Sequence, residues 1–484
     1  MFQEPFGAGA VLLLTFLLLV STIIALYHRK RINTAKDFLI ANHRAKWYDF
    51  ASSQIAYAVG VSSTIIFFPS LTYQYGPIAI PIVLVGLAFS LLIFGLLVKK
   101  SEKVSKFLKT DYGLPGFISG NFKEGRGKNF IFFFSSIIIA LVYWGLFGFE
   151  LLALRILFGE MFPQVSSLPI LVIAFGLVIV YVNMGGLLST MRTDFVQTLM
   201  FMLIICFFSF SVFPQLFGPD HSIANIFSSE IFSTHPNVSS GDIWFFAIMW
   251  FILSFAFPLT SQDQWSRGSA VSEGPEAQKV EHRNTYIGLT VSILGFIPYV
   301  AILMMGLWMF AINPTFSDAG VLQTIPAKLI NLMVGKAPVG LFIPVLIAIA
   351  ISTADTALIT STQVIGGIKK KWGETLTSCR IVTLILGFLG ITTALSFPDI
   401  ISGVWALVSL PVIFLPLILA RIWDRGHKTW VAVVVLITGT VIGLGAGRAG
   451  GKIAAASPLF LLLIPIVLYP LLHLVPIGGK YNGN

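Results

Sequence analysis

The chain has 484 residues, of which 56% are hydrophobic and only 11% are charged, and its mean hydropathy is +0.88. Soluble domains carry roughly 25% charged residues, so the composition excludes a soluble protein and predicts an integral membrane protein. The net charge of +10 is spread over several short polar segments, whereas a nucleic-acid surface needs it gathered on one face. The two cysteines do not suggest a disulfide framework.

Apolar stretches of ~20 residues, long enough to cross a bilayer, recur along the whole chain. The period-two alternation that membrane barrels require is absent, so the sequence predicts an all-α integral membrane protein. We expect about thirteen transmembrane helices, at residues 8–27, 48–69, 77–98, 129–158, 167–185, 194–216, 242–262, 284–312, 337–366, 376–396, 400–420, 429–446 and 457–474.

The positions of lysine and arginine predict the orientation of these helices. With the N-terminus outside, the segments expected in the cytoplasm hold all but five of the 31 basic residues. Arg192 and Arg267 are both assigned to loops of this kind. The exceptions are Arg155, Lys328, Lys336, Arg448 and Lys452. The positive-inside rule therefore predicts a multi-pass protein of the cell membrane with an outside N-terminus and a cytoplasmic C-terminus.

Two of the expected spans contain helix breaks. In the second span, Gly60 stands among β-branched and hydroxyl residues, which weakens the helix at mid-membrane depth. In the seventh, Pro258 lacks an N–H and frees the carbonyl of Ser254. Irregular backbone at this depth survives where it lines a cavity. Two interrupted spans five helices apart predict an inverted-repeat transporter with its site at the midplane.

The ninth span carries hydroxyl and carboxyl groups on one face. At 100° per residue, Ser352, Thr353, Asp355 and Thr356 fall within an arc of roughly 160°. A carboxylate in hydrocarbon is costly and should face a cavity, a partner or an ion, and hard oxygen ligands suit a small hard cation. Alternatively, the hydroxyls bond their own helix and Asp355 is protonated or paired. No histidine cluster indicates a transition metal.

Four short motifs lie in order in the expected spans. They are DFLIA at Asp37–Ala41, GGL at Gly185–Leu187 followed by TDFVQ at Thr193–Gln197, STAD at Ser352–Asp355, and Trp405–Ala406 before a proline-containing segment. Together they resemble the sodium:solute symporter family, and the resemblance runs from about Asp37 to Trp423. Trp265 departs from the pattern, because the family usually has an arginine there, and the cytoplasmic end of that helix is then expected to close differently.

The resemblance implies a LeuT-type fold, in which two repeats of five helices have opposite orientation. Spans two to eleven would form the repeats, with extra helices at both ends of a single transport domain covering residues 1–484. Residues 8–27 would form a peripheral N-terminal helix and residues 429–474 the peripheral C-terminal helices. Residues 48–262 would hold the first repeat and the start of the second, which extends over residues 242–420.

The resemblance also implies where cations bind. The family's conserved sodium site corresponds to the carbonyls of Ala58, Val61 and Ile349 and the hydroxyls of Ser352 and Thr353. A possible second cation site corresponds to Asp194, Ser352, Asp355 and Thr356, although Asp355 stands where the family also has serine. Asp194 has an alternative role as the N-cap of its helix, since it opens the expected span.

The substrate pocket is less clearly indicated. The residues expected to line it are Ser62, Trp144, Glu150, Ser254, Phe255 and Trp405. For all of these except Glu150, core packing is the better explanation. Glu150 could receive an ammonium group of the solute or pair with Arg155. Span 77–98 offers almost no polar side chains, and unpaired sugar hydroxyls are costly. An amino acid or a monocarboxylate is therefore favoured over a sugar.

These features predict a sodium-coupled symporter that imports a small organic solute by alternating access. Its expected partners are the solute, Na⁺ as coupling ion and the lipid bilayer, with no cofactor and no nucleic acid; the oligomeric state stays open. No paired His/Asp, Ser/His or Cys/His arrangement suggests an enzyme. The main alternative is a proton-coupled transporter in which Asp355 or Asp194 titrates. A membrane-embedded enzyme and a transporter-derived sensor are more distant alternatives.

Overall fold

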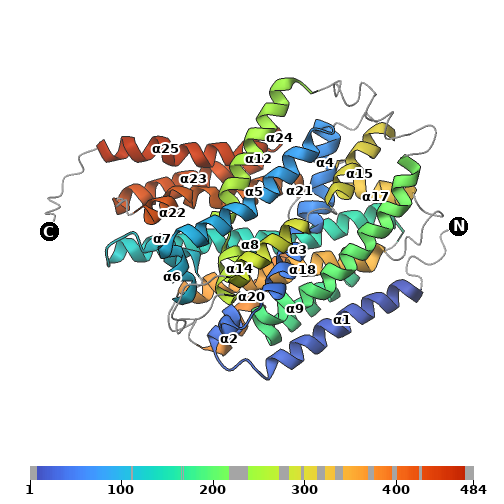
Figure 1. Ribbon diagram of the computed structural model, residues 1–484, viewed down its shortest axis with the longest axis horizontal. Coiled ribbons are helices and arrows are strands. Elements are labelled where there is room, and N and C mark those ends of the chain that lie inside the picture. Colours follow the sequence, from blue (N-terminus) through green and yellow to red (C-terminus); the bar gives the residue numbers. More distant parts are fainter. Residues whose placement is uncertain are drawn as a thin grey trace.

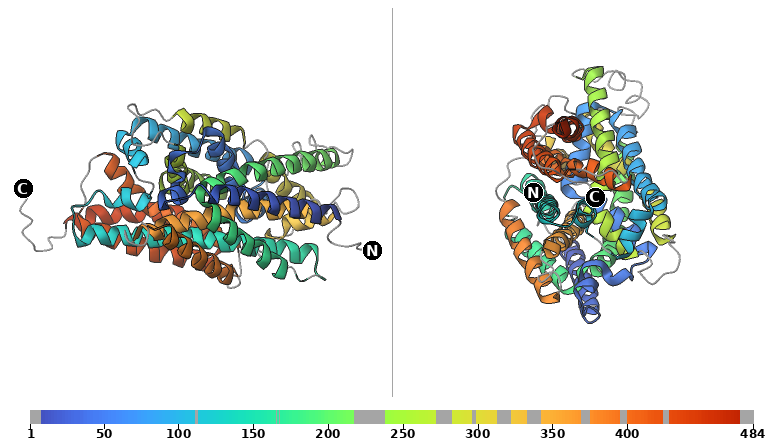
Figure 2. Two further views of the ribbon diagram at one scale, coloured as in Figure 1. Left: turned by 90° about the horizontal axis from the view of Figure 1, so that it is seen from below. Right: turned by 90° about the vertical axis from the view of Figure 1, so that its left-hand side faces the viewer.

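The computed structural model describes residues 8–110, 113–164, 166, 168–216, 238–271, 283–295, 299–312, 322–332, 342–368, 375–394, 400–423 and 428–474. Every regular element in these ranges is a helix, and most of the helices run roughly along the long axis of the molecule (Figure 1, Figure 2). The all-α fold class predicted from the hydropathy pattern is therefore confirmed.

Eight described helices are long and apolar enough to cross a membrane, and a ninth span is formed by a bent pair of helices. The eight are α1 (Ala8–Arg29), α5 (Ala79–Lys100), α8 (Arg126–Met161), α9 (Leu168–Leu216), α12 (Ser240–Thr260), α18 (Phe342–Ile368), α21 to α22 (Ile400–Ile422) and α23 (Thr429–Ala449). Shorter apolar helices are α15 (Tyr299–Ile312), α20 (Leu376–Ala394) and α25 (Ser457–Leu474). Because α9 covers two expected spans, each of the thirteen coincides with described helix over most of its length.

The helix α9 differs from the expected pair of separate helices. It continues through Gly186, whose φ of 57° and ψ of −164° produce a kink. A Cβ atom here would overlap the carbonyl oxygen of Phe38 in α2 (Ala35–Ile40), so both the conformation and the close approach require glycine. Arg192 consequently lies in a helix, 3.6 Å from Asp49, and its assignment to a loop was wrong. Asp194 lies inside the helix as well, so it is not an N-cap.

The bent pair forms the second span. The helix α3 (Trp47–Ala58) and the π-helical turn η2 (Val61–Ile66), which continues as α4 (Phe67–Tyr75), are inclined by 52°. Val59 and Gly60 between them are not helical, and Gly60 has extended backbone with φ −83° and ψ 153°. This interruption exposes backbone N–H groups at the start of η2, in the interior of the bundle.

The interruption in the seventh span lies later than expected. The helix α12 continues through Pro258 to Thr260, and the chain is extended only at Ser261 before α13 (Gln262–Val271) begins. The Thr260 hydroxyl donates to the Ala256 carbonyl at 2.9 Å, which supports the turn that contains the proline. A third irregular turn, η4 (Leu410–Phe414), separates α21 (Ile400–Ser409) from α22 (Leu415–Ile422).

The helix α18 lies at the centre of the bundle and packs against α8 and α9. Its most apolar stretch is 100% buried, against 22% for α1 and 39% for α23. The helix α1 packs on α9 at one edge, whereas α23 packs on α25 at the opposite edge (Figure 1). The terminal helices are therefore peripheral. The remaining elements are η1 (Ala41–His43), α6 (Glu102–Thr110), α7 (Leu114–Ser119), α14 (Arg283–Leu294), α17 (Ile325–Leu332) and α24 (Gly451–Ala455).

Candidate functional site

A cavity of about 150 Å³ lies beside the first helix break. Its wall is mostly aromatic and aliphatic, with neutral polar groups between. The aromatic lining residues are Tyr57, Phe67, Phe68, Trp250, Phe257 and Trp405, and the neutral polar ones are Gln54, Ser63, Thr64, Ser90, Ser254, Gln264 and Thr353. Of the six pocket residues expected from the sequence, Ser254 and Trp405 line this cavity, and the structure places the other four outside its wall.

Of the residues expected to hold the first cation, the structure brings Ala58, Val61 and Thr353 together at the break. Ala58 and Thr353 both line the cavity. A Cβ atom on Gly60 would lie 3.2 Å from the Thr353 hydroxyl oxygen, so this hydroxyl faces the irregular backbone directly. The Thr353 oxygen is buried and has no hydrogen-bond partner. Ile349 lies one turn earlier on α18 and is also buried.

The other members of this set already make hydrogen bonds. The Ala58 carbonyl accepts the hydroxyl of Thr64 at 2.7 Å. The N–H of Val61 donates to Glu150 at 2.8 Å. The Ser352 hydroxyl donates to an oxygen of Asp194 at 2.6 Å. The Ala58 carbonyl keeps a second lone pair after accepting one hydrogen bond, and Val61 and Ser352 act only as donors in their bonds. These bonds therefore leave acceptor capacity for a cation.

The residues expected to hold a second cation lie close by, on α9 and α18. Both carboxylate oxygens of Asp194 accept hydroxyl groups, from Ser53 at 2.5 Å and from Ser352 at 2.6 Å. One oxygen of Asp355 accepts the hydroxyl of Tyr181, and its other oxygen is buried without a partner. The hydroxyl of Thr356 accepts a guanidinium N–H instead of facing an open site.

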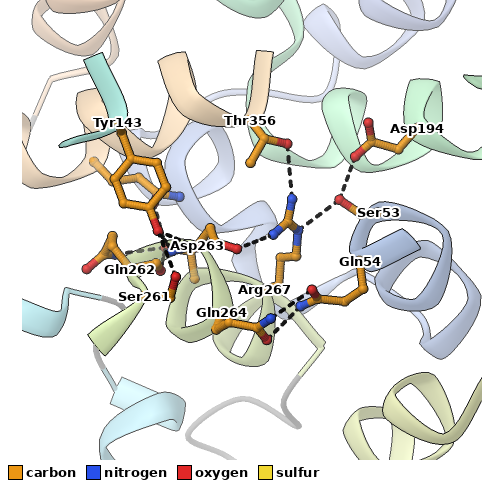
Figure 3. A network of polar contacts seen from close by, with 12 residues as sticks. Ser53, Gln54, Tyr143, Asp194, Ser261, Gln262, Asp263, Gln264, Arg267 and Thr356 are labelled. Carbon is orange, nitrogen blue, oxygen red and sulfur yellow. Dashed lines mark hydrogen bonds and ion pairs between the residues drawn. The ribbon is translucent and has the colours of Figure 1, made fainter. Parts of the chain in front are cut away.

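That guanidinium belongs to Arg267 of α13, which is only 1% exposed (Figure 3). It forms an ion pair with Asp263 at 2.6 Å and donates to the hydroxyls of Ser53 at 2.9 Å and Thr356 at 3.0 Å. Its central carbon lies 4.8 Å from the centre of the Tyr57 ring. The assignment of Arg267 to a loop was wrong, because α13 folds back into the bundle after Ser261. The i, i+4 spacing from Asp263 is the signal that indicates this helix.

The cluster shown in Figure 3 and its extension to Asp355 carry unequal charge. Among the described residues of this cluster, Asp263 pairs with the guanidinium of Arg267, and Asp194 is linked to it through the Ser53 hydroxyl. Asp355 accepts the hydroxyl of Tyr181 and has no guanidinium partner of its own, so three carboxylates stand against one guanidinium. All are at most 1% exposed. Buried charges are costly unless they are balanced, so this arrangement favours a bound cation or a proton.

Glu150 occupies a position that the sequence did not suggest. Its carboxylate accepts the N–H groups of Val61 at 2.8 Å and Ser62 at 3.2 Å, and the hydroxyl of Ser62. It therefore caps the start of η2 from the neighbouring helix α8, although it is far away in sequence. The alternative partner Arg155 is exposed, and the described ion pairs do not join it to Glu150.

Polar contacts also join the two broken spans. The side-chain amides of Gln54 on α3 and Gln264 on α13 bond each other reciprocally at 2.7 and 2.9 Å (Figure 3). Tyr143 of α8 donates to Asp263 and contacts the Ser261 hydroxyl at 3.3 Å. The sequence did not indicate these residues, because the partner of each polar side chain is far away in sequence and is brought near only by the tertiary fold.

Trp265 marks a departure from the family pattern noted above. The ring is 0% exposed, donates its indole N–H to the Leu259 carbonyl at 2.9 Å and packs against Phe107 and Phe117. This end of the helix is thus held by aromatic packing. The guanidinium of α13 comes from Arg267, two residues after Trp265.

Comparisons with known proteins support the fold. No family model and no curated protein matches the sequence. A solved structure of the substrate-bound outward-open state of a Na⁺-coupled sialic acid symporter is similar with a TM-score of 0.72 at 18% identity, covering 96% of this chain and 98% of that chain. A manganese transporter from Eremococcus coleocola, in complex with an aromatic bis-isothiourea substituted compound, is similar with a TM-score of 0.52 at 15% identity, covering 88% and 94%.

At such identities the similarity concerns the fold alone. Both similar structures are transporters, and the LeuT-type fold expected from the motifs is confirmed by the first of them. The near-complete coverage of both chains extends the agreement to the whole bundle. The chain is a multi-span membrane protein with the fold of a Na⁺-coupled symporter.

Proposed function

We propose that this protein is a sodium-coupled symporter that imports a small organic solute by alternating access. The observation that carries the proposal is the Thr353 hydroxyl, which is buried without a partner beside the break at Gly60 and on the wall of the cavity. An unsatisfied buried polar group costs about 1–3 kcal/mol. A sodium ion between Thr353 and the carbonyls released by the break would satisfy it.

The position of this site supports coupling between ion and solute. Ala58 and Thr353 belong both to the cation set and to the cavity wall, so an ion between them draws the broken span toward α18 and completes one side of the cavity. The solute then binds a surface that the ion has organised. Each sodium ion that enters with the membrane potential contributes ~2.3 kcal/mol per 100 mV to accumulation.

A second cation site at Asp194, Ser352, Asp355 and Thr356 is part of the proposal. Its support is the excess of buried carboxylates over guanidinium groups and the oxygen of Asp355 that has no partner. The same observation supports the alternative in which Asp355 carries a proton and the transporter is proton-coupled. An ion and a proton balance the charge equally well, so gradient experiments have to separate them.

The solute class and the orientation also belong to the proposal. The cavity wall is mostly aromatic and aliphatic with neutral polar groups between, which supports the preference for a small solute over a sugar. The preference for an amino acid or a monocarboxylate is not kept in the proposal, because no basic side chain that could pair with a carboxylate stands among the described lining residues. For the orientation we retain an outside N-terminus and a cytoplasmic C-terminus, on the distribution of basic residues.

The proposal is tested by uptake into vesicles that contain the purified protein. A panel of radiolabelled small solutes is screened with an imposed inward sodium gradient, with an equal potassium gradient as control. We expect at least one solute to accumulate only with sodium. Accumulation that is equal in sodium and potassium, for every solute that enters, would contradict sodium coupling.

A further inference from the structure

The broken second span places the start of a helix at the centre of the bundle. Such a helix start presents free N–H groups and the positive end of the helix dipole, and in transporters with discontinuous helices it receives anionic groups of the substrate. In this protein the N–H groups of Val61 and Ser62 are already bonded to the carboxylate of Glu150 at 2.8 and 3.2 Å. The anion position is therefore occupied by the protein itself.

Glu150 also lies close to the cavity wall without being part of it. A Cβ atom on Gly60 would lie 2.7 Å from an oxygen of Glu150 and 3.2 Å from the hydroxyl of Thr353, which lines the cavity. The Glu150 carboxylate is 0% exposed, and no described lysine or arginine forms an ion pair with it. A solute carboxylate in the cavity would be repelled by the Glu150 carboxylate, since only Gly60 lies between the two.

The cavity wall itself provides neither a positive nor a negative partner among the described residues. Its polar groups are hydroxyls and amides, and Trp250 and Trp405 approach each other edge to face with ring centres 6.4 Å apart. Phe67 contacts Trp405 and Phe68 contacts Trp250 in the same manner. Aromatic edges and faces of this kind suit a flat or apolar body. A cavity of about 150 Å³ is the size that accepts benzene in an engineered protein.

We infer that the transported solute is a small uncharged molecule, with a flat or apolar body and one or two neutral hydrogen-bonding groups, and that Glu150 excludes solutes that carry a carboxylate. This inference rests on the proposed transport function and names its substrate class. Glu150 acts as the resident anion of the helix start, so a solute does not need to bring one.

The test compares acids with their amides, which share size and shape. Benzamide with benzoate and isobutyramide with isobutyrate are measured for binding to the purified full-length protein, with and without sodium. We expect each amide to bind at least roughly tenfold more tightly than its acid, as repulsion between two charges at reduced dielectric requires. An acid that binds as tightly as its amide would overturn the inference, as would a panel in which no amide binds.

Glu150→Gln keeps an acceptor for the helix start and removes the charge. We expect it to reduce the preference for amide over acid roughly tenfold, whereas Glu160→Gln, at the exposed end of the same helix, leaves the preference unchanged. An unchanged preference in Glu150→Gln would overturn the role of Glu150. Binding that prefers amides but ignores sodium would count against the sodium coupling and leave the solute class standing, so the two failures are distinct.

Discussion

The unpartnered hydroxyl of Thr353 gives a prediction that separates ion binding from protein stability. In Thr353→Val the shape of the side chain is kept and one of about five expected sodium ligands is lost. We expect this loss to cost about 1–3 kcal/mol of ion binding, which raises the sodium concentration for half-maximal uptake roughly 5- to 150-fold. Because the hydroxyl has no partner in the structure, the melting temperature without sodium should stay equal or rise.

Ser352→Ala should behave differently, although the two residues are adjacent. The Ser352 hydroxyl donates to Asp194 at 2.6 Å, so its removal costs about 1.5–3 kcal/mol of stability, as for hydrogen bonds to charged groups, even without sodium. Ser361 on the same helix donates only to the Ala357 carbonyl, and Ser361→Ala serves as the control. Melting curves in detergent over a sodium titration, together with uptake, give both quantities. A sodium dependence unchanged in Thr353→Val would refute the assignment of the first site.

Three further predictions concern two of the buried charged groups and the topology. Arg267→Gln leaves the buried carboxylate of Asp263 unpaired and should destabilise the protein by about 3–5 kcal/mol. Lys452→Gln breaks an exposed ion pair and should cost less than about 1 kcal/mol of stability. Equal melting temperatures of the two variants would contradict this. Asp355→Asn should lower the number of sodium ions moved per solute, measured with independently set sodium and pH gradients; pH-driven uptake that this variant abolishes would instead favour the proton alternative. Cysteines at 214–242, mostly outside the described residues, should react with impermeant thiol reagents applied outside, and those at 99–128 should not; the reverse pattern would invert the topology.

The fold was largely predictable because a long apolar stretch directly indicates a helix that crosses the lipid bilayer. Each expected span coincides with described helix over most of its length. The weak helix formers around Gly60 also predict the position of the first interruption correctly. Helix joints were harder. The kink at Gly186 and the continuation through Pro258 depend on how closely α2 approaches α9 and on the hydroxyl of Thr260, and neither contact is visible in a local pattern.

The site was predictable only where its chemistry follows from one helix. The oxygen-rich face of α18 is periodic, so Ser352, Thr353 and Asp355 could be named from spacing. Arg267 was missed because the count of basic residues treats every arginine as a loop residue, although a buried arginine with a carboxylate partner is tolerated inside a bundle. The role of Glu150 was missed because its partners, the N–H groups of another helix, carry no sequence signal.

The polar network around Arg267 has a consequence for the rate of the proposed transport cycle. Its hydrogen bonds connect α13 to Ser53 of α3 and Thr356 of α18, and Ser53 continues to Asp194 of α9. A movement that separates α3 and α13 from α9 and α18 has to break the bond from Arg267 to Thr356 and the bond from Ser53 to Asp194 together. Each break takes a hydrogen-bond partner from a buried charged group, which is costly. We therefore expect intermediate positions to be sparsely populated, and a high enthalpic barrier to separate the two end states of the proposed cycle. Turnover should rise steeply with temperature, while slippage without ion or solute stays rare.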